Sequence, residues 1–496
     1  MIPKPQKHIL SKSTFIKGCQ CPKALWLNKY QSQFKTPINK QQQAIFDRGT
    51  NVGKLAEQLF PGGVDARPEN AYSYQQSVVD TFQFIEQGHK IIYEAAFQYD
   101  EVLAALDILV NKEGKWMAYE VKSSTSISDA ILNDAALQYY VITQSGLPLV
   151  DFSIVTINTE YVRNGNINVS QLFRIESVIT QVLELQPMIA GKISELKEVL
   201  QQTSMPIRDI GTYCSIPYPC DFKEYCWKHI PDNSVFEIKG KGGATRAFEL
   251  YKQGIVSISE IPDEFKLNAD QEIQVKAHKS KLPHIEKSEL DEFLKQFEYP
   301  LYFMDFETFQ TAVPDFDGTR PYQQIPFQYS VHRLDAPKNE LFHFEWLGES
   351  GSDPRRDFID HLLQVIENSG SIVVYNASFE CSRLKELAFC LPEKAAEIEA
   401  LQKRIIDLMI PFQRKYYYLP EMKGSYSIKK VLPALVNNMN YDELEIGNGT
   451  DASAAYYQLQ FLLDQRVMEK TREDLLKYCE LDTLAMVKVL GKLNNI

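Results

Sequence analysis

The chain of 496 residues has no apolar run that approaches the roughly 20 residues needed to cross a membrane. No apolar signal segment follows the opening Met-Ile-Pro-Lys-Pro-Gln-Lys-His. Internal repeats and low-complexity tracts are also missing. We therefore expect a cytoplasmic protein with no membrane partner, and the length predicts two or three domains.

An excess of positive charge is absent as well. The net charge is −12, which argues against a protein that binds nucleic acid over its whole surface. Residues 1–58 nevertheless carry ten Lys and Arg, from Lys4 to Lys54, against Asp47 and Glu57. This basic arm has a local charge of +8, and the remainder carries −20. It either contacts phosphates or forms a solvated face.

Two regions show alternating strand and helix patterns. In the first, strands are expected at 91–98, 102–110, 115–122 and 149–158, with helices at 127–145 and 171–204. In the second, strands are expected at 301–308, 326–333, 341–347 and 371–375, with helices at 354–368, 379–390 and 472–491. Short helices are expected at 243–254 and 257–265 between them. The pattern predicts an α/β protein with domains at 1–232 and 296–496 and a helical connector at 233–295.

The first cluster of candidate residues lies in the first region. Asp107 stands in the apolar strand Ala-Leu-Asp-Ile-Leu-Val, where a carboxylate is costly without a partner. Glu120 and Lys122 lie on one face of the next strand because they are two residues apart. Two carboxylates can hold Mg²⁺ or Mn²⁺, and the lysine can orient or help deprotonate the attacking water. The competing interpretation is a surface strand with a salt bridge, which the hairpin context disfavours.

This hairpin, D-x(n)-E-x-K, resembles the PD-(D/E)xK nuclease superfamily. The following helix, with Gln138, resembles the RecB-type motif, although Ile142 stands where that family usually has Tyr. Glu57 occupies the place of a His or acidic residue on the first helix. The resemblance implies a restriction-endonuclease-like domain. Its catalytic residues would be Asp107, Glu120, Lys122 and Gln138, with the metal on Asp107 and Glu120.

Eight cysteines are present, and in a cytosolic chain they should not form disulfides. Three follow one another as Cys214-x5-Cys220-x5-Cys226, and Cys21 begins Cys-Pro-Lys-Ala-Leu-Trp near the N-terminus. Four thiolates suit an iron–sulfur cluster or Zn²⁺, and the sequence does not separate the two. The arrangement resembles the iron–sulfur RecB-like nucleases of CRISPR and recombination systems, which implies a 4Fe–4S cluster on these four cysteines. Cys381, Cys390 and Cys479 are expected in the core.

The second cluster of candidate residues begins at Asp305 and Glu307, which alternate with Met304 and Phe306. One face of this strand is apolar and the other acidic. Two like charges this close repel each other, so the pair requires a cation. The strand therefore predicts a second metal site.

This D-x-E motif resembles the DEDD exonucleases, which have an RNase H-like fold. The remaining motifs resemble that family through Asn376-Ala-Ser-Phe-Glu380, where the family has Asp at the last position, and Tyr478-x3-Asp482. The resemblance implies that Asp305, Glu307, Glu380 and Asp482 hold two divalent ions about 4 Å apart. It also implies that Tyr478 positions the nucleophilic water.

Three further features belong to this region. Asp407 is expected to be structural. Residues 321–329 and 424–430 resemble a bacterial family of uncharacterised proteins with both nuclease modules. In that family Lys429 and Lys430 would contact a phosphate, although a surface helix start is equally compatible with the residues.

We therefore expect a metal-dependent DNA nuclease. A RecB-like head with an iron–sulfur cluster would grip or cut a strand, and a DEDD head would trim 3′ ends. One alternative is an RNA-processing 3′–5′ exonuclease. A second is a nucleic-acid-binding scaffold with one inactive head. The expected partner is nucleic acid, DNA before RNA.

Overall fold

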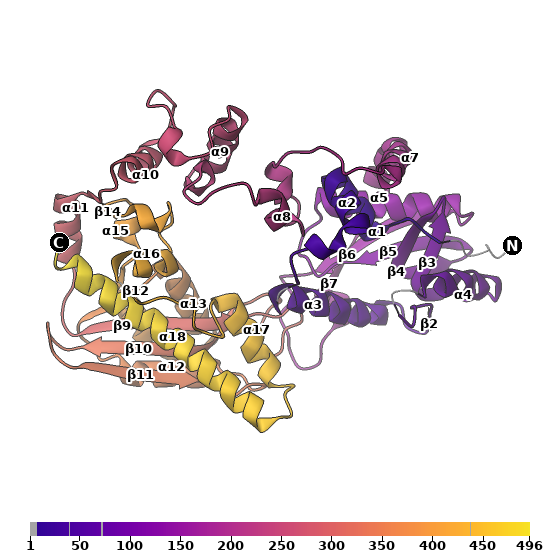
Figure 1. The fold of residues 1–496 in the computed structure, drawn as a ribbon. Helices are drawn as coiled ribbons and strands as arrows, with labels where there is room; N and C mark the ends of the chain where they lie inside the picture. Colours follow the sequence, from indigo (N-terminus) through magenta and orange to yellow (C-terminus); the bar gives the residue numbers. More distant parts are fainter. Residues whose placement is uncertain (1–6, 39, 71–72, 437) are drawn as a thin grey trace. The chain divides into compact units, whose positions relative to one another are not determined.

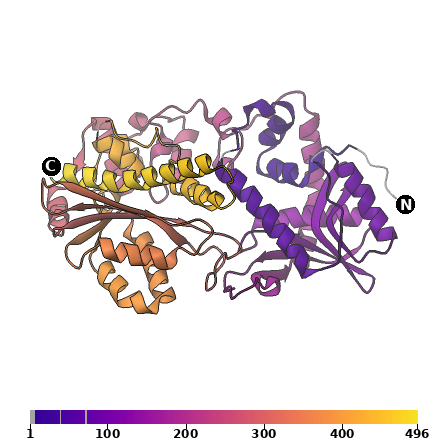
Figure 2. The same cartoon turned by 90° about the horizontal axis from the view of Figure 1, so that it is seen from below.

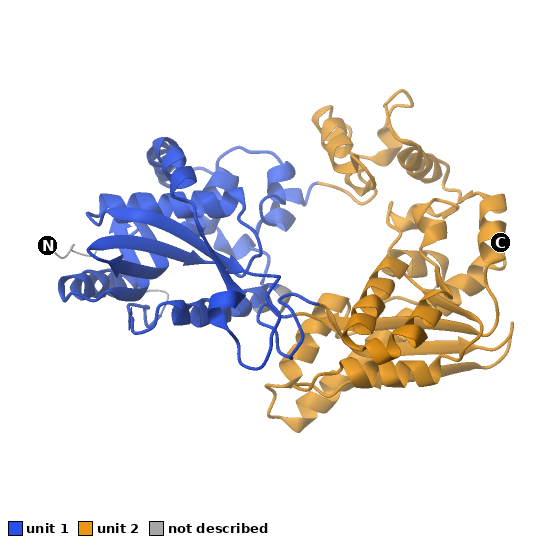
Figure 3. Ribbon diagram, turned by 180° about the vertical axis from the view of Figure 1, so that it is seen from behind, with its two compact units in different colours: residues 1–229, 311–323 blue, residues 230–310, 324–496 orange. Residues whose placement is uncertain are grey.

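The computed structural model describes residues 7–38, 40–70, 73–436 and 438–496, so Lys4 of the basic arm lies outside the described residues. The chain divides into two compact units (Figure 3). The first contains residues 1–229 and 311–323, and the second contains residues 230–310 and 324–496. Each unit holds a mixed sheet with helices, which confirms the α/β fold class.

The first unit is built on a mixed sheet (Figure 1). Its order is β2 (Val64–Asp65), β3 (Ile91–Tyr99), β4 (Val102–Lys112), β5 (Lys115–Val121), β6 (Leu149–Ile157) and β7 (Phe173–Ser177), and β1 (Leu10–Ser11) pairs with β4. Strands β3, β4 and β5 are antiparallel, whereas β5 and β6 are parallel. Parallel neighbours need a crossover, and helix α5 (Asp129–Gln144) provides it.

The sequence predictions for this unit hold except at one place. The four strands and the helix at 127–145 are confirmed. The helix expected across 171–204 is wrong in its first part, because residues 173–177 form the strand β7, paired antiparallel with β6. A four-residue helix, α6 (Val169–Leu172), precedes that strand, and α7 (Ile179–Gln201) follows it. Pairing with the edge of the sheet thus decides the structure of this segment.

The two largest hydrophobic clusters of the first unit cover its sheet. The larger one packs the sheet against α1 (Lys12–Gln20), α2 (Pro22–Tyr30), α5 and α7. The smaller one brings α3 (Lys40–Ala56) against the sheet through Val52 and Ala56, and it includes Ala312 of the 311–323 segment. Helix α4 (Tyr74–Glu86) packs on β3. The hairpin of β4 and β5 therefore lies in the centre of the unit.

The second unit has a five-stranded sheet. Its order is β11 (Leu341–Leu347), β10 (Ile325–Leu334), β9 (Leu301–Phe309), β12 (Ser371–Val374) and β13 (Ile405–Asp407). The first three strands are antiparallel, and β9, β12 and β13 are parallel. The four strands expected here are confirmed, and β13 was not expected.

Helices cover both faces of this second sheet (Figure 2). Helices α12 (Arg355–Val365), α13 (Ala377–Cys390) and α14 (Ala395–Gln402) pack on the face that carries Tyr302, Met304 and Phe306. The long helix α18 (Gln465–Leu493) packs on β9 and β10 from the other face. The apolar face expected for residues 301–307 therefore packs against α12, α13 and α14, and the acidic face is turned toward α18.

The rest of the chain forms short elements. They are α8 (Lys223–Trp227), α9 (Gly243–Lys252), α10 (Ala269–Ser280), α11 (Lys287–Leu294), α15 (Ile410–Gln413), α16 (Ile428–Leu435), α17 (Gly449–Leu459), and the pair of β8 (His284–Ile285) with β14 (Tyr417–Tyr418). The helix expected at 257–265 is only a 3₁₀ turn at Ile258–Glu260. No helix among the described residues has the length and apolarity of a membrane span.

Candidate metal centres

The acidic face of β9 meets α18 in the second unit. Asp305 and Glu307 leave β9 on one side because they are two residues apart, and Asp482 reaches them from α18. One carboxylate oxygen of each residue lies within 4.8 Å of the other two. Hard cations such as Mg²⁺ and Mn²⁺ prefer carboxylate oxygens. These three residues could hold such a cation.

The pKa values in this group reflect carboxylates crowded in a buried place. Burial and the neighbouring Asp482 hold the pKa of Asp305 well above its usual range. Burial, Asp305 and Asp482 do the same to the pKa of Glu307. Burial also raises the pKa of Asp482 to about 6. Three like charges at this spacing need a compensating cation to ionise together.

Glu380 lies near this group but outside the set of three. It stands in the first turn of α13 and is only 2% exposed. Burial, and then the charge of Asp305, raise the pKa of Glu380 to about 9. Within the described residues, Glu380 Oε2 has no hydrogen-bond partner. A buried carboxyl oxygen with free lone pairs is thus available beside Asp305.

Tyr478 lies one helical turn before Asp482 and is buried. Lys429 Nζ donates a hydrogen bond to the Tyr478 hydroxyl at 3.2 Å and another to the carbonyl of Gly447 at 2.6 Å. Its ammonium also lies 4.9 Å from the ring centre of Tyr478 and 5.2 Å from that of Tyr441. Lys429 therefore fixes the position of the Tyr478 side chain.

Two residues of this centre escaped the sequence analysis. The Tyr441 hydroxyl donates a hydrogen bond to Asp482 Oδ1 at 2.6 Å. Gly449 begins α17, and a Cβ there would lie 3.0 Å from Glu307 Oε2. Tyr441 stands in an irregular segment with no motif around it, so nothing in the sequence pointed to it.

Asp407 has the structural role that was expected of it. Its Oδ1 accepts hydrogen bonds from the backbone N–H groups of Asn376 at 3.0 Å and Met409 at 2.9 Å. Its Oδ2 accepts one from Ala377 at 3.0 Å. Asn376 has a φ of 92°, in the left-handed region, so this turn needs support. Asp407 thus holds the start of α13, the helix that carries Glu380.

In the first unit, the hairpin of β4 and β5 brings the expected carboxylates together. Ile108 pairs with Tyr119, so Asp107 and Glu120 follow as the next opposite residues. Asp107 Oδ2 accepts a hydrogen bond from the N–H of Val121 at 2.6 Å. Both acids and Lys122 line a cavity of about 310 Å³. The two carboxylates of this cavity could hold a cation.

Glu120 is the centre of a network of ion pairs. Its Oε1 accepts hydrogen bonds from Lys12 Nζ at 2.6 Å and from Lys122 Nζ at 2.7 Å. Lys122 also donates to Asp134 Oδ2 at 2.8 Å. Glu120 is 1% exposed, and within the described residues neither Glu120 Oε2 nor Asp134 Oδ1 has a hydrogen-bond partner. These oxygens retain lone pairs for a further cation.

The two carboxylates of this hairpin differ in protonation. Burial and the charge of Glu120 raise the pKa of Asp107 to about 8. Burial alone would raise the pKa of Glu120, but Lys12 and Lys122 outweigh it and lower that pKa to about 2. At neutral pH and without a cation, Glu120 is therefore charged and Asp107 is largely neutral. A metal ion that binds Asp107 displaces a proton.

Lys12 and Asp134 were not among the expected site residues. Lys12 lies in α1, 108 positions before Glu120, and its sequence Ser-Lys-Ser has no distinguishing pattern. Asp134 did leave a signal, because it lies one turn before Gln138 on α5 and is buried in an apolar helix. A buried carboxylate requires a partner, and Lys122 is that partner.

The other residues of the first unit that the sequence singled out, Gln138, Glu57 and Ile142, lie at different positions in its fold. Gln138 is fully buried on α5, and its amide has no hydrogen-bond partner within the part of the chain described. Glu57 pairs with Arg67 at 2.9 Å, and Arg67 also pairs with Glu94 at 3.3 Å. Glu94 lines the acid cavity with Asp107. Ile142, at the position of the expected tyrosine, is a fully buried core residue.

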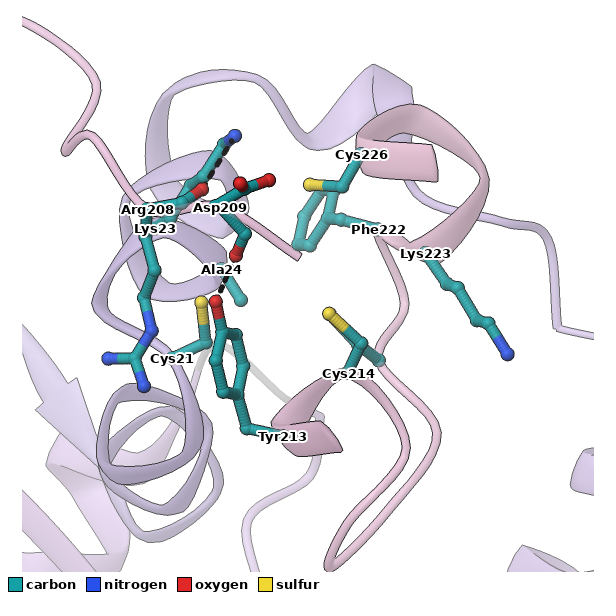
Figure 4. Close-up of a pocket in the computed structure, with 11 residues that line it drawn as sticks. Cys21, Lys23, Ala24, Arg208, Asp209, Tyr213, Cys214, Phe222, Lys223 and Cys226 are labelled. Carbon is teal, nitrogen blue, oxygen red and sulfur yellow. Dashed lines mark hydrogen bonds between the residues drawn. The ribbon is translucent and has the colours of Figure 1, made fainter. Parts of the chain in front are cut away.

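The four expected cysteines line one small cavity (Figure 4). Cys21 precedes α2, Cys214 ends a 3₁₀ turn, Cys226 lies in α8, and Cys220 lies between the last two. Burial raises the pKa of Cys220 to about 11, and it raises the pKa of Cys226 as well. The fully buried Phe222 also lines the cavity, together with Lys23, Ala24, Arg208, Asp209, Tyr213 and Lys223. The chain therefore gathers four thiols around one cavity, two of them buried and two partly buried, and such a set could hold a metal or a cluster.

The three cysteines expected in the core differ in burial. Cys479 is buried, and its thiol lies 3.8 Å from Asp305 Oδ2. Cys381 and Cys390 are only partly buried, so their expected place in the core is wrong. Both lie on α13, whose apolar contacts with the sheet are made by Leu384 and Leu387 instead.

Several lysines of the basic arm are bound within the first unit. Lys17 pairs with Asp221, and Lys12 pairs with Glu120. Lys23 and Lys29 donate hydrogen bonds to the carbonyls of Arg208 and Leu200. These contacts tie α1 and α2 to distant segments. These four lysines of the arm are therefore bound within the fold as parts of helices α1 and α2.

Comparison with known proteins finds similarity without a described activity. Residues 302–427 match a family described as Domain of unknown function (DUF2779). The chain is similar to Uncharacterized protein UU173 of Ureaplasma parvum, with 31% identity over 239 residues, 41% of this chain and 32% of that protein. It is also similar to the MG366 homolog of Mycoplasma pneumoniae, with 29% identity over 211 residues, 39% of this chain and 32% of that protein. The chain spans about a third of the length of these curated relatives.

Proposed function

We propose that the chain is a metal-dependent nuclease with one hydrolytic centre in each unit. The observation that carries this proposal is that buried carboxylates converge in both units. In the second unit, one oxygen each of Asp305, Glu307 and Asp482 lies within 4.8 Å of the others. In the first unit, Asp107 and Glu120 line one cavity, and Glu120 Oε2 is free within the described residues. Structural ion pairs alone would not leave such oxygens unused.

The sheet orders support the two fold assignments of this proposal. The order β11-β10-β9-β12-β13, with three antiparallel and then parallel strands, agrees with an RNase H-like fold of the DEDD exonucleases. The hairpin of β4 and β5, followed by α5 and the parallel strand β6, agrees with a PD-(D/E)xK nuclease of the RecB type. Asp107, Glu120, Asp305 and Glu307 lie on strands of the two sheets, whereas Glu380 and Asp482 lie on helices α13 and α18.

In the first unit, the chain's own residues would bind the cation and orient the attacking water. Asp107 and Glu120 would hold the cation, which supplies Lewis-acid activation of water and of the scissile phosphate. Lys122 would orient the attacking water, and Asp134 keeps its ammonium in place at 2.8 Å. Lys122 pairs with Glu120 at the same time. The lysine is thus held by two carboxylates at the rim of the acid cavity.

In the second unit, Tyr478 would position the attacking water beside Asp482. Its hydroxyl accepts a hydrogen bond from Lys429, so its own proton is free to turn toward the acids. Burial and the charge of Asp482 raise the pKa of Tyr478, which keeps that proton on the hydroxyl. Asp305, Glu307 and Asp482 would hold the first ion, and Glu380 would complete a second site beside Asp305.

The cysteine cavity supports a 4Fe–4S cluster over zinc. Zinc bound to four thiolates at about 2.3 Å places the sulfurs roughly 3.8 Å apart. Among the described residues, no three cysteine sulfurs form a group within 4.8 Å of one another. A cluster of iron and sulfide spans a wider set of ligands than one ion does. Cys21, Cys214, Cys220 and Cys226 would hold it and tie α2 to α8.

A second candidate function follows from Glu380. If the longer side chain keeps the second ion from binding, the second unit would grip a nucleic-acid end without cutting it. The whole chain would then be a nuclease with a single active head. RNA is the alternative substrate for either head, since the acid sites contact phosphates rather than sugars.

Activity assays separate these functions. Wild type, Asp305→Ala and Lys122→Ala are incubated with labelled single-stranded DNA, duplex DNA and RNA in Mg²⁺ or Mn²⁺. We expect Asp305→Ala to reduce the rate of stepwise 3′ trimming by about 100-fold or more. Lys122→Ala should reduce the rate of cleavage by the first unit to a similar extent. Glu264→Ala, an exposed acid of the second unit, is the matched control. Absence of any wild-type cleavage would refute the enzyme proposal.

A further inference from the structure

A second, larger cavity adjoins the acid site of the first unit. Its volume is about 750 Å³, against about 310 Å³ for the acid cavity. Lys122 and Ser123 line both cavities, so the two meet at the catalytic lysine. We call the larger cavity the α1 groove, because Lys12, Ile16 and Gln20 of α1 form one of its walls.

The cysteine loop, residues 214–226, contributes another part of the lining of the α1 groove. Tyr218, Pro219, Cys220 and Asp221 of this loop line the groove. Helix α1 holds the loop in place, because Gln20 Nε2 donates hydrogen bonds of 2.7 Å to the carbonyls of Tyr213 and Tyr218. Lys17 adds an ion pair with Asp221. The groove is therefore built by defined contacts.

Two aromatic side chains stand open at the α1 groove. Tyr218 is 51% exposed and Phe46 is 54% exposed, and both line it. Exposed apolar rings that are grouped at one cavity indicate a binding site, whereas single apolar residues scattered over a surface do not. Aromatic faces next to lysines are the usual platform for nucleobases, because every base has a flat face and every nucleotide a negative phosphate.

We propose that the α1 groove binds unpaired nucleotides of the strand whose phosphate enters the acid cavity, with their bases stacked on Tyr218 and Phe46. This inference rests on the proposed nuclease function of that cavity. A strand with its phosphate beside Lys122 has its neighbouring nucleotides at the groove. In a duplex the base faces are already covered by one another, so the groove selects single strands. The shared chemistry of DNA and RNA, base and phosphate, is what these residues recognise.

The proposal also gives the cysteine loop a role in substrate binding. Tyr218 lies between the two ligand candidates Cys214 and Cys220, so the geometry of the thiol cluster sets the place of the stacking ring. Loss of the cluster would then weaken the binding of a strand even though the acids are untouched.

The test measures binding without cleavage. Fluorescence anisotropy of labelled 20-nucleotide DNA, RNA and hairpin-duplex probes is recorded with the 496-residue chain and no added divalent metal. A 2-aminopurine in the single-stranded probe reports stacking directly. The variants are Tyr218→Ala, Phe46→Ala and the conservative Tyr218→Phe. The matched control is Tyr99→Ala, a 37% exposed tyrosine of the same unit that does not line the groove.

We expect Tyr218→Ala and Phe46→Ala each to weaken single-strand binding about 10-fold, or about 1.4 kcal/mol, and to remove the 2-aminopurine quenching. Tyr218→Phe and Tyr99→Ala should bind as wild type does, and the duplex should bind more weakly throughout. Wild-type affinity and quenching in both alanine variants would overturn the inference, as would preferential binding of the duplex.

The same measurements distinguish this inference from the proposed function. If the variants lose binding while the wild type cleaves nothing in Mg²⁺ or Mn²⁺, the groove stands and the nuclease proposal fails. If the wild type cleaves and both alanine variants cleave and bind equally well, the nuclease stands and the groove fails. The DNA and RNA probes show which strand the groove prefers.

Discussion

Lys12 donates a hydrogen bond of 2.6 Å to Glu120 Oε1, the oxygen that also accepts one from Lys122 at 2.7 Å. Two ammonium groups thus share one buried carboxylate oxygen and leave Oε2 free. The contact spans 108 positions of the chain and ties α1 to the centre of the sheet. It holds Glu120 ionised, so that a divalent cation meets a preformed negative ligand.

The first prediction concerns this contact. Lys12→Met should lower the free energy of unfolding of the first unit by about 1–3 kcal/mol, because it removes one of the two cations paired with a buried carboxylate. Lys12→Arg should restore most of the loss. Urea unfolding followed by fluorescence measures the effect. Lys115→Met, an exposed lysine of β5, is the control. Equal stability of Lys12→Met and wild type would show that Lys122 alone suffices.

The second prediction is that a substitution of Glu380 reduces activity without changing stability. Burial and Asp305 raise its pKa to about 9, so without metal it is protonated at pH 7. Glu380→Gln replaces a neutral acid by a neutral amide of the same shape, and the unfolding free energy should change by less than about 0.5 kcal/mol. Exonuclease activity should fall by about 100-fold, because the amide is a poor ligand.

Denaturant unfolding and cleavage kinetics at pH 7 check both halves of this prediction. Undiminished trimming by Glu380→Gln would remove Glu380 from the metal centre. It would then favour a single ion on Asp305, Glu307 and Asp482.

His332 predicts how the stability of the second unit depends on pH. Burial, and then His343 and Lys488, lower the pKa of His332 from 6.5 to about 4. The unfolded chain therefore takes up a proton between pH 6.5 and pH 4 that the folded chain does not. The free energy of unfolding is therefore highest above pH 6.5, where His332 is neutral in both states. It decreases by about 3 kcal/mol as the pH falls from 6.5 toward 4.

The comparison for this prediction is His332→Asn, which does not titrate. Thermal unfolding of the wild type and of this variant at pH 7 and pH 5 measures how strongly the stability of each protein depends on pH. The variant should lose distinctly less stability between these two pH values. An identical pH dependence of the two proteins would show that His332 is not the group responsible.

The cysteine cavity predicts a coloured protein. Purified without oxygen, the wild type should be brown and absorb near roughly 400 nm, where iron–sulfur clusters absorb. Cys214→Ser should lose the colour and the iron, because one of four ligands is gone. Cys381→Ser, which removes a partly buried cysteine outside the cavity, should keep both. Equimolar zinc without iron in the wild type would contradict the cluster.

The elements predicted from the sequence are those set by neighbouring residues. The alternation of Asp305 and Glu307 with Met304 and Phe306 follows from the two-residue period of a strand, and the structure keeps it. The hairpin of β4 and β5 followed in the same way from its turn, and it brought Asp107 beside Glu120.

What the sequence did not reveal depends on contacts between distant segments. Lys12 meets Glu120 only because β1 pairs with β4 and carries α1 over the sheet. Tyr441 meets Asp482 because an irregular segment folds over α18. The strand β7 forms because an edge of β6 is open to it. No local period records such contacts, so the pairing of Lys12 with Glu120 was not predicted and β7 was predicted as helix.

Cleavage by the double variant Asp107→Asn/Asp305→Asn tests the central claim most directly. Both substitutions keep the size of the side chain but replace one carboxylate ligand in each acid site by an amide. Labelled single-stranded and duplex substrates are incubated with this variant, each single variant and wild type in Mg²⁺ and in Mn²⁺. We predict that each single variant keeps one cleavage pattern and that the double variant keeps none. Wild-type cleavage by the double variant would contradict the assignment of both centres.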